Sequence, residues 1–172
     1  LTMKKILFIA LLFSNLVFSQ NIDFEGFMNF SYSNNSGKIH LEINNLDKEF
    51  LYINSLSRGI GNNDLGLDRG QLGNTRIVFF TKRGNKILMV QPNTRYVSNS
   101  DNYLENKAVE EAFARSVLFS FEIIEEKNNN YIIDLTPLLM NDAHGVAQRL
   151  RHSNSGNYSL NKSMSAIELD RT

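Results

Sequence analysis

Short runs of alternating apolar and polar residues, separated by turn-forming residues, constrain the fold of this chain more than any other feature of its sequence. In residues 38–43, three aliphatic side chains alternate with Lys38, His40 and Glu42. Because successive side chains of a strand point to opposite faces, this run predicts a half-buried β-strand. It follows a weakly alternating, aromatic-rich run at residues 24–33, across the turn-forming sequence Asn-Asn-Ser-Gly. Two such runs joined by a glycine-containing turn predict a β-hairpin.

The same pattern predicts further strands along the chain. They are expected at residues 50–56, 76–81, 86–91, 117–123 and 131–135. Arg83-Gly84-Asn85 joins the second and third of these runs into another hairpin, and Asn128-Asn129-Asn130 joins the last two. Glycine and asparagine suit these places because they tolerate the positive φ angles of tight turns.

Helical spacing is confined to the C-terminal half of the chain. Residues 106–115 carry apolar or small side chains at i, i+4 and i+5, which predicts a helix. A short helical turn is expected at residues 138–140. A second helix is expected from Asp142, as its N-cap, to about Arg151, where Arg149 also complements the helix dipole.

Strands in hairpin order followed by late helices predict an α+β fold. It consists mainly of antiparallel β hairpins, or a β meander, with one or two short helices in the C-terminal half. An alternation that begins at residues 165–169 is interrupted by the end of the given sequence. We therefore expect residues 20–172 to form one β-rich domain that is incomplete at its C-terminal end.

Composition excludes several classes of protein. The 172 residues include 18 basic and 18 acidic side chains, whereas a nucleic-acid binder that works by bulk electrostatics needs a basic excess. The chain has no cysteine. Disulfide scaffolds, thiol nucleophiles and cysteine-ligated metal sites are therefore excluded.

Residues 3–19 have the layout of a secretory signal peptide. Lys4 and Lys5 precede an apolar run, and Val17-Phe18-Ser19 places suitable residues before a predicted cleavage at Gln20. The apolar run is interrupted by polar residues and is shorter than the roughly 20 residues that a membrane span needs. We therefore expect no stable membrane span and an exported protein, periplasmic or extracellular in a Gram-negative bacterium.

Residues 55–73 form a glycine-rich segment that stands out as a candidate functional loop. Five of the ten glycines lie there, namely Gly59, Gly61, Gly66, Gly70 and Gly73. Long loops in compact domains are uncommon and often functional. A phosphate cradle is disfavoured, because Gly59 and Gly61 lead to Asp64 instead of a third glycine, and the segment contains no lysine.

Two other interpretations of this segment stay open. Asn62, Asp64 and Asp68 have the even spacing of calcium ligands, although no glutamate stands at the position that an EF-hand requires. Alternatively, the segment is a structural loop whose glycines set tight turns and in which Asp64, Asp68 and Arg69 bond locally. The sequence favours the structural interpretation, because the calcium pattern is incomplete.

The three histidines do not form a recognisable metal site. A zinc protease carries two histidines one helical turn apart in HExxH, but His144 is followed by Gly145 and apolar residues. His144 and His152 are eight residues apart, which on a continuous helix is a rise of about 12 Å. This distance is too long for both side chains to bind one metal ion. His40 lies on the polar face of its strand. No catalytic or metal-binding residue is assigned, although a spatial Ser/His/Asp triad stays open because triads leave no local pattern.

Several blocks of the sequence resemble a bacterial family of secreted zinc-dependent metalloproteases. These large HExxH proteins begin with regions that are domains of unknown function. The blocks are residues 49–52, 55–56, 59–73, 76–79, 90–93, 112–114, 116–118, 142–147 (which includes Asp142, His144 and Gly145) and 165–166. The resemblance covers roughly residues 26–172. It implies that the complete protein is a secreted zinc endopeptidase whose HExxH helix lies beyond this chain, so zinc is expected in the parent protein and no cofactor in this chain.

Two classes of function follow from these observations. In the first, the chain is the N-terminal, non-catalytic portion of the metalloprotease, and its partner is the downstream catalytic domain of the same polypeptide. In the second, it is a free-standing secreted module that binds peptide or glycan at a sheet edge or in a groove lined by Tyr96 and Tyr103. A weaker possibility is a folding aid or inhibitor of its own protease. A peptide or protein substrate is a further expected partner, and nucleic acid is not.

Overall fold

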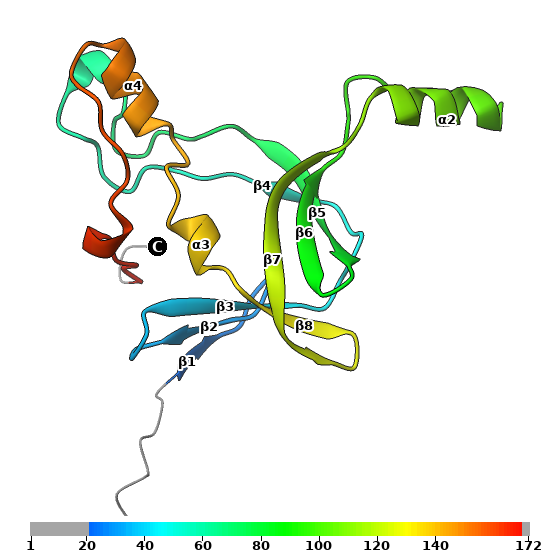
Figure 1. The fold of residues 1–172 in the computed structure, drawn as a ribbon, viewed down its shortest axis with the longest axis horizontal. Coiled ribbons are helices and arrows are strands. Elements are labelled where there is room, and N and C mark those ends of the chain that lie inside the picture. Colours follow the sequence, from blue (N-terminus) through cyan, green and yellow to red (C-terminus); the bar gives the residue numbers. More distant parts are fainter. Residues whose placement is uncertain (1–20, 170–172) are drawn as a thin grey trace, which may run out of the picture.

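The computed structural model describes residues 21–169, in which eight antiparallel strands form one sheet. The strands are β1 (Asn21–Phe24), β2 (Phe30–Ser33), β3 (Lys38–Ile43), β4 (Phe50–Tyr52), β5 (Arg76–Arg83), β6 (Lys86–Gln91), β7 (Ser116–Lys127) and β8 (Asn130–Asp134). Their order across the sheet is β1-β2-β3-β8-β7-β6-β5-β4. The predicted α+β class with mainly antiparallel strands is confirmed (Figure 1). The predicted signal peptide, residues 3–19, lies outside the described residues.

The helices are short and stand at the periphery of the sheet (Figure 1). They are α2 (Tyr103–Ala112), α3 (Thr136–Leu139) and α4 (Val146–His152), with 3-10 turns η1 (Asn63–Leu65) and η2 (Lys162–Met164). Helix α2 projects from the sheet at one end of the molecule, and α4 lies at the opposite end beside the segment that contains η1 (Figure 1). No helix within residues 21–169 is long and apolar enough to cross a membrane.

The predicted hairpins form, with one correction at the N-terminal side. Strands β2 and β3 pair from Ser33 opposite Lys38, and β5 and β6 pair from Arg83 opposite Lys86. The prediction of one strand over residues 24–33 was wrong, because the chain reverses between Phe24 and Phe30. These two phenylalanines pair across β1 and β2, and their rings stack at 4.6 Å.

Both predicted helices form, but their limits differ from the prediction. Helix α2 begins three residues early because the Asn102 side chain accepts the backbone N–H of Leu104 at 2.9 Å and caps the helix there. Helix α4 begins at Val146 instead of Asp142, because Gly145 is left-handed, with φ of 64°. Asp142 still caps α4, since its carboxylate accepts the free backbone N–H groups of the first turn, from Val146 at 2.8 Å and from Ala147 at 2.9 Å.

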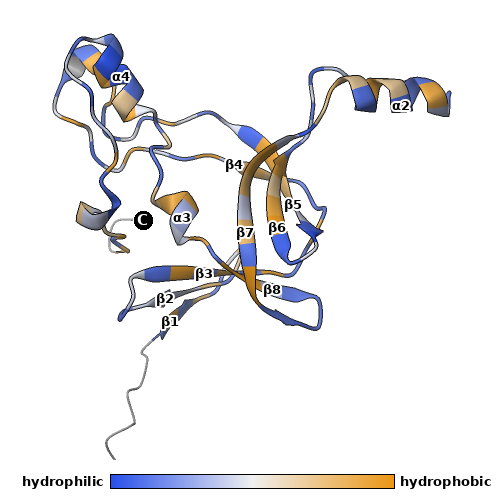
Figure 2. Cartoon of the chain, in the orientation of Figure 1, coloured by the Kyte–Doolittle hydropathy of each residue, from blue (hydrophilic) through white to orange (hydrophobic). Residues whose placement is uncertain are grey.

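The core lies within the curl of the sheet. Its buried side chains come from strands that are distant in the sequence, namely Leu41, Ile43, Val78, Phe80, Ile87, Met89, Phe121, Tyr131 and Ile133. Figure 2 shows hydrophobic residues concentrated along β3 and the middle strands β5 to β7. The alternation in β3 and β8 accounts for this arrangement, because every second side chain of these strands enters the core.

The connection between β3 and β4 crosses from one half of the sheet to the other. Within it, the backbone N–H of Asp47 donates to the carbonyl of Phe80 at 2.7 Å, beyond the residues of β5 that pair with β4. Phe50 then packs on Phe80, with ring centroids 5.3 Å apart. This connection therefore lies against β5, where it borders the cleft described below.

Asp134, at the end of β8, joins the strand to α3. Burial raises the pKa of its carboxyl, but hydrogen bonds from Thr136 and Lys38 outweigh that effect and hold the pKa below its ordinary value. The Lys38 ammonium lies 3.0 Å from the carboxylate, and the backbone N–H of Thr136 donates to it, also at 3.0 Å. The hydroxyl of Thr136 accepts the N–H of Ile39 at 2.9 Å, so this cluster fastens α3 to β3.

Candidate functional site

The glycine-rich segment forms a hairpin-like excursion between β4 and β5. Ser55 bridges Leu72, and the backbone N–H of Leu56 donates to the carbonyl of Gln71 at 2.9 Å. Gly70 has φ of +82° and donates its N–H to the carbonyl of Leu56 at 2.7 Å. Leu67, which is only 1% exposed, anchors the excursion.

The five glycines of this segment serve two geometrical needs. Gly61, Gly66 and Gly70 have positive φ, which non-glycine residues rarely adopt. Gly59 lies so close to the backbone at Leu67 that a side chain would meet the carbonyl oxygen at 3.0 Å, and a side chain at Gly73 would clash with Asn54.

The polar candidates of the same segment include two residues that form local hydrogen bonds. The Asn62 side chain accepts the backbone N–H of Asp64 at 3.0 Å, and the carbonyl of Asp68 accepts the N–H of Gln71 at 3.2 Å. The side chains of Asp64, Asp68 and Arg69 are exposed. Among residues 21–169, no group of three or more histidine, aspartate or glutamate residues could hold a metal ion.

The glycine-rich segment, residues 55–73, and the block at residues 142–147 lie side by side. The Arg149 guanidinium of α4 donates to the carbonyls of Leu65 at 3.2 Å and Gly66 at 3.0 Å. A hollow of about 430 Å³ lies beside α4, lined by Leu56, Leu150 and Leu160 and by the block Asp142-Ala143-His144. The His144 Nε2 atom is buried without a hydrogen-bond partner in the described structure, and Asp142 is committed to capping α4.

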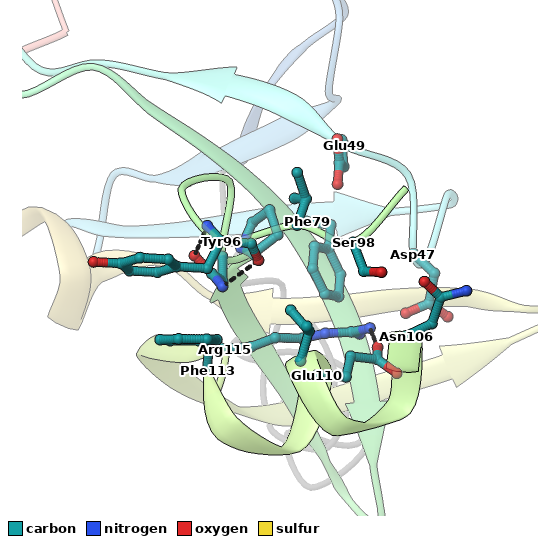
Figure 3. Close-up of a pocket in the computed structure, with 13 residues that line it drawn as sticks. Asp47, Glu49, Phe79, Tyr96, Ser98, Asn106, Glu110, Phe113 and Arg115 are labelled. Atoms are coloured by element: carbon teal, nitrogen blue, oxygen red, sulfur yellow. Dashed lines mark hydrogen bonds and ion pairs between the residues drawn. The ribbon is translucent and has the colours of Figure 1, made fainter. Parts of the chain in front are cut away.

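A larger cleft, of about 540 Å³, lies between α2 and the sheet (Figure 3). Its residues come from five places: the connection between β3 and β4, strand β5, the connection that precedes α2, α2 itself, and the connection that follows it. They are Asp47, Glu49, Phe79, Pro92, Asn93, Tyr96, Val97, Ser98, Asn106, Val109, Glu110, Phe113 and Arg115. Pockets of about 300–1,000 Å³ are the usual size for binding small molecules or side chains, so we treat this cleft as the candidate site.

The aromatic end of the cleft is built where α2 leaves and rejoins the sheet. Tyr96 in the first connection stacks on Phe113 in the second, with ring centroids 4.2 Å apart and planes 14° apart. Asn93 fixes the first connection: its amide donates to the carbonyl of Tyr96 at 2.8 Å and its oxygen accepts the N–H of Arg95 at 3.1 Å. The two rings therefore form a fixed wall (Figure 3).

Arg115 crosses the floor of the cleft toward α2 (Figure 3). Its guanidinium lies 5.8 Å from the centroid of the Phe79 ring and donates to the Glu110 carboxylate at 2.6 Å. Phe79 is buried and forms the apolar floor. These contacts hold α2 beside the sheet, although the helix itself contributes no buried residue.

Asp47 and Glu49 give the cleft an acidic end, away from the stacked rings (Figure 3). Both carboxylates are exposed, and within residues 21–169 neither takes part in an ion pair. Asp47 has φ of 56°, so the backbone turns sharply at this residue. The cleft therefore carries three carboxylates against one guanidinium.

The sequence analysis named one residue of this cleft, Tyr96, and missed the others. Tyr96 lines it as expected for a groove residue, whereas Tyr103 does not. Asp47, Phe79 and Arg115 are far apart in the sequence, and no local pattern connects them. Only the pairing of β5 with the strands around it brings them together.

The fold and the cleft define the class of protein: a mainly antiparallel, α+β domain with an aromatic and acidic surface cleft. A family model described as a domain of unknown function (DUF5117) matches residues 70–172. Because the match covers more than half of the chain, the protein belongs to this family. The matched range includes the aromatic wall and Arg115, whereas Asp47 and Glu49 precede that range. No curated protein and no solved structure matches the chain.

Proposed function

We propose that this chain is the N-terminal, non-catalytic portion of a larger secreted zinc-dependent metalloprotease, and that it packs against the catalytic domain of the same polypeptide. The resemblance of residues 26–172 to the N-terminal regions of such enzymes supports this parentage. In this proposal residues 3–19 direct export to the periplasm or the exterior of a Gram-negative bacterium and are then removed.

The observation that carries the packing role is the exposed apolar surface on and beside α2. Tyr103 is 72% exposed and Leu104 is 69% exposed, and Val97 in the preceding connection is 65% exposed. Exposed apolar patches often mark protein interfaces, and burial of a single leucine side chain contributes about 1.5–3 kcal/mol. The projection of α2 from the sheet makes this surface accessible to another domain (Figure 1).

The proposal assigns the zinc and the HExxH helix to the catalytic domain. There the metal would activate a water molecule and the glutamate would act as the base. The role of the present chain is to bind that domain, and we expect the chain to be inactive by itself.

The test uses the full-length secreted gene product, with Leu104→Glu as the disrupting variant. Ile124→Glu is the matched control, since Ile124 is also an exposed aliphatic residue but lies on β7. We expect bound zinc in all three proteins and faster hydrogen exchange of the α2 amides in Leu104→Glu alone. Absence of zinc, or equal exchange of α2 in wild type and both variants, would contradict the proposal.

The cleft favours a second candidate, a free-standing secreted module that binds peptide or glycan without enzymatic activity. Its aromatic wall of Tyr96 and Phe113 offers the kind of flat apolar surface on which such ligands pack. This candidate predicts a secreted product without zinc that binds its ligand unaided. The zinc content therefore separates the two candidates.

A further inference from the structure

We propose that the cleft between α2 and the sheet binds a basic side chain, arginine or lysine, in an extended segment of another polypeptide. This inference goes beyond the function proposed above, because binding in the cleft requires no catalytic domain. It assigns to the chain a peptide-recognition site that selects for positive charge.

The apolar part of the cleft provides a fixed surface for the aliphatic stem of the ligand side chain or for a neighbouring apolar residue. Tyr96 and Phe113 hold each other in a stack of 4.2 Å, and Asn93 fixes the backbone at Tyr96. Phe79 closes the floor. Rings that are already ordered lose little conformational entropy when a ligand packs on them.

The carboxylates determine which ligand the cleft accepts. Asp47 and Glu49 lie at the end away from the stacked rings (Figure 3) and have no ion pair within the described residues. The neighbouring Lys48 does not line this cleft; it lines a second hollow with Phe27 and Phe50, and Glu49 borders both. An acidic ligand would meet uncompensated negative charge, whereas an ammonium or guanidinium group would pair with it.

Arg115 already shows the recognition chemistry within the same cleft. Its guanidinium lies 5.8 Å from the Phe79 ring centroid and 2.6 Å from the Glu110 carboxylate. Cations within about 6 Å of a ring centroid are attracted by the ring face, and a carboxylate adds a charge-assisted hydrogen bond. The Arg95 guanidinium likewise lies 5.5 Å from the centroid of the Tyr96 ring, whereas Asp47 and Glu49 have no ion pair within the described residues.

The dimensions of the cleft suit one side chain and the backbone that carries it. Its volume is about 540 Å³, and its lining includes residues of α2 and of the connection from β3 to β4. An extended segment can therefore place a basic residue between the rings and the carboxylates while the rest of the segment stays in solvent.

The test measures binding of a labelled, acetylated hexapeptide amide, with one arginine beside one phenylalanine, to the secreted chain by fluorescence anisotropy. The matched probe carries citrulline, which has the shape of arginine without its charge. We expect at least about tenfold weaker binding of the citrulline peptide, and weaker binding of the arginine peptide as the salt concentration rises.

The variant Asp47→Asn with Glu49→Gln removes the two unpaired charges while keeping the size of both side chains. Asparagine also tolerates the positive φ at residue 47, so this variant preserves the backbone. The control, Asp64→Asn with Glu125→Gln, removes two exposed carboxylates that lie outside the cleft. We expect about five- to tenfold weaker binding of the arginine peptide to the cleft variant and unchanged binding to the control.

Several results would overturn the inference. They are equal binding of the arginine and citrulline peptides, equal loss of binding in the two double variants, and no binding of either peptide at millimolar concentration. A dimer that binds no peptide would show that a second copy of the chain covers the cleft. The peptide comparison uses the wild-type chain, so it remains decisive if a variant fails to fold.

Discussion

Replacement of Gly70 by valine tests whether the glycine-rich segment depends on its backbone geometry. Gly70 has φ of +82°, and a Cβ atom placed there meets no atom within 4 Å. Valine at this position would therefore be destabilising through backbone strain and not through a clash. A non-glycine residue held in such a conformation costs about 1–3 kcal/mol, and a β-branched residue lies at the upper part of that range.

A matched control isolates this strain. A Cβ atom at Gly26 would also meet open space, but the φ of Gly26 lies outside the left-handed region. Because both substitutions remove similar entropy from the unfolded chain, the difference between Gly70→Val and Gly26→Val reports strain in the folded state. We expect a difference of about 2 kcal/mol, which corresponds to about 4–8 °C in Tm for a domain of this size.

The assay is thermal unfolding followed by circular dichroism, together with hydrogen exchange of the Leu56 amide. That amide donates to Gln71 across the base of the excursion, so its exchange detects local opening that Tm would miss. Gly70→Asn should fall between wild type and Gly70→Val, since asparagine tolerates positive φ. Equal Tm values and equal exchange in Gly70→Val and Gly26→Val would refute the reasoning.

Three further predictions concern the rest of the fold. Ile133→Ala should lower the free energy of unfolding by about 2–5 kcal/mol in denaturant titrations, because Ile133 is 0% exposed in the core, whereas Ile124→Ala on the exposed face should cost far less. The pKa of the Asp134 carboxyl is lowered in the folded state, so its contribution to stability is present above the unfolded pKa of about 3.8. That contribution is lost as the pH falls through the lower folded value, and Tm falls with it. The variant Asp134→Asn should therefore show a smaller decline in Tm between about pH 5 and pH 2. Arg149→Met should speed hydrogen exchange in α4 and in the glycine-rich segment, because it removes the hydrogen bonds to Leu65 and Gly66, and unchanged exchange in both would contradict this role.

The sequence predicts the hairpins of this fold because their signals are local. Residues 86–91 and the turn at Gly84 lie next to each other in the chain, and one face of each run is apolar. The chain reversal between Phe24 and Phe30 was not predicted, because the local signal there is ambiguous. Aromatic residues on both sides of a turn have the composition of one longer strand, and only their stacking across two strands distinguishes the two arrangements.

The helix limits show how side-chain hydrogen bonds modify a periodic pattern. Asn102 starts α2 earlier than its apolar residues indicate. Asp142 caps α4 from outside the helix, because the left-handed Gly145 separates the two. Both residues are standard capping types, but the sequence alone does not specify how far from the first helical residue a cap will lie.

The candidate cleft could not be predicted, because its parts meet only through the sheet. Asp47 reaches β5 through a backbone hydrogen bond to Phe80, and Arg115 reaches the same place from the start of β7. The order of the strands, in which β7 lies between β8 and β6, decides this proximity. The sequence analysis named Tyr96 as a groove residue, and the topology determines where the cleft lies.

The most direct test of the proposed function is the coding DNA beyond the codon for Thr172. We expect the reading frame to continue for several hundred codons and to encode an HExxH helix, which would supply the zinc site of the catalytic domain. A stop codon directly after Thr172 would contradict the proposed function. The chain would then be the whole product, and its cleft would have to act without a protease domain.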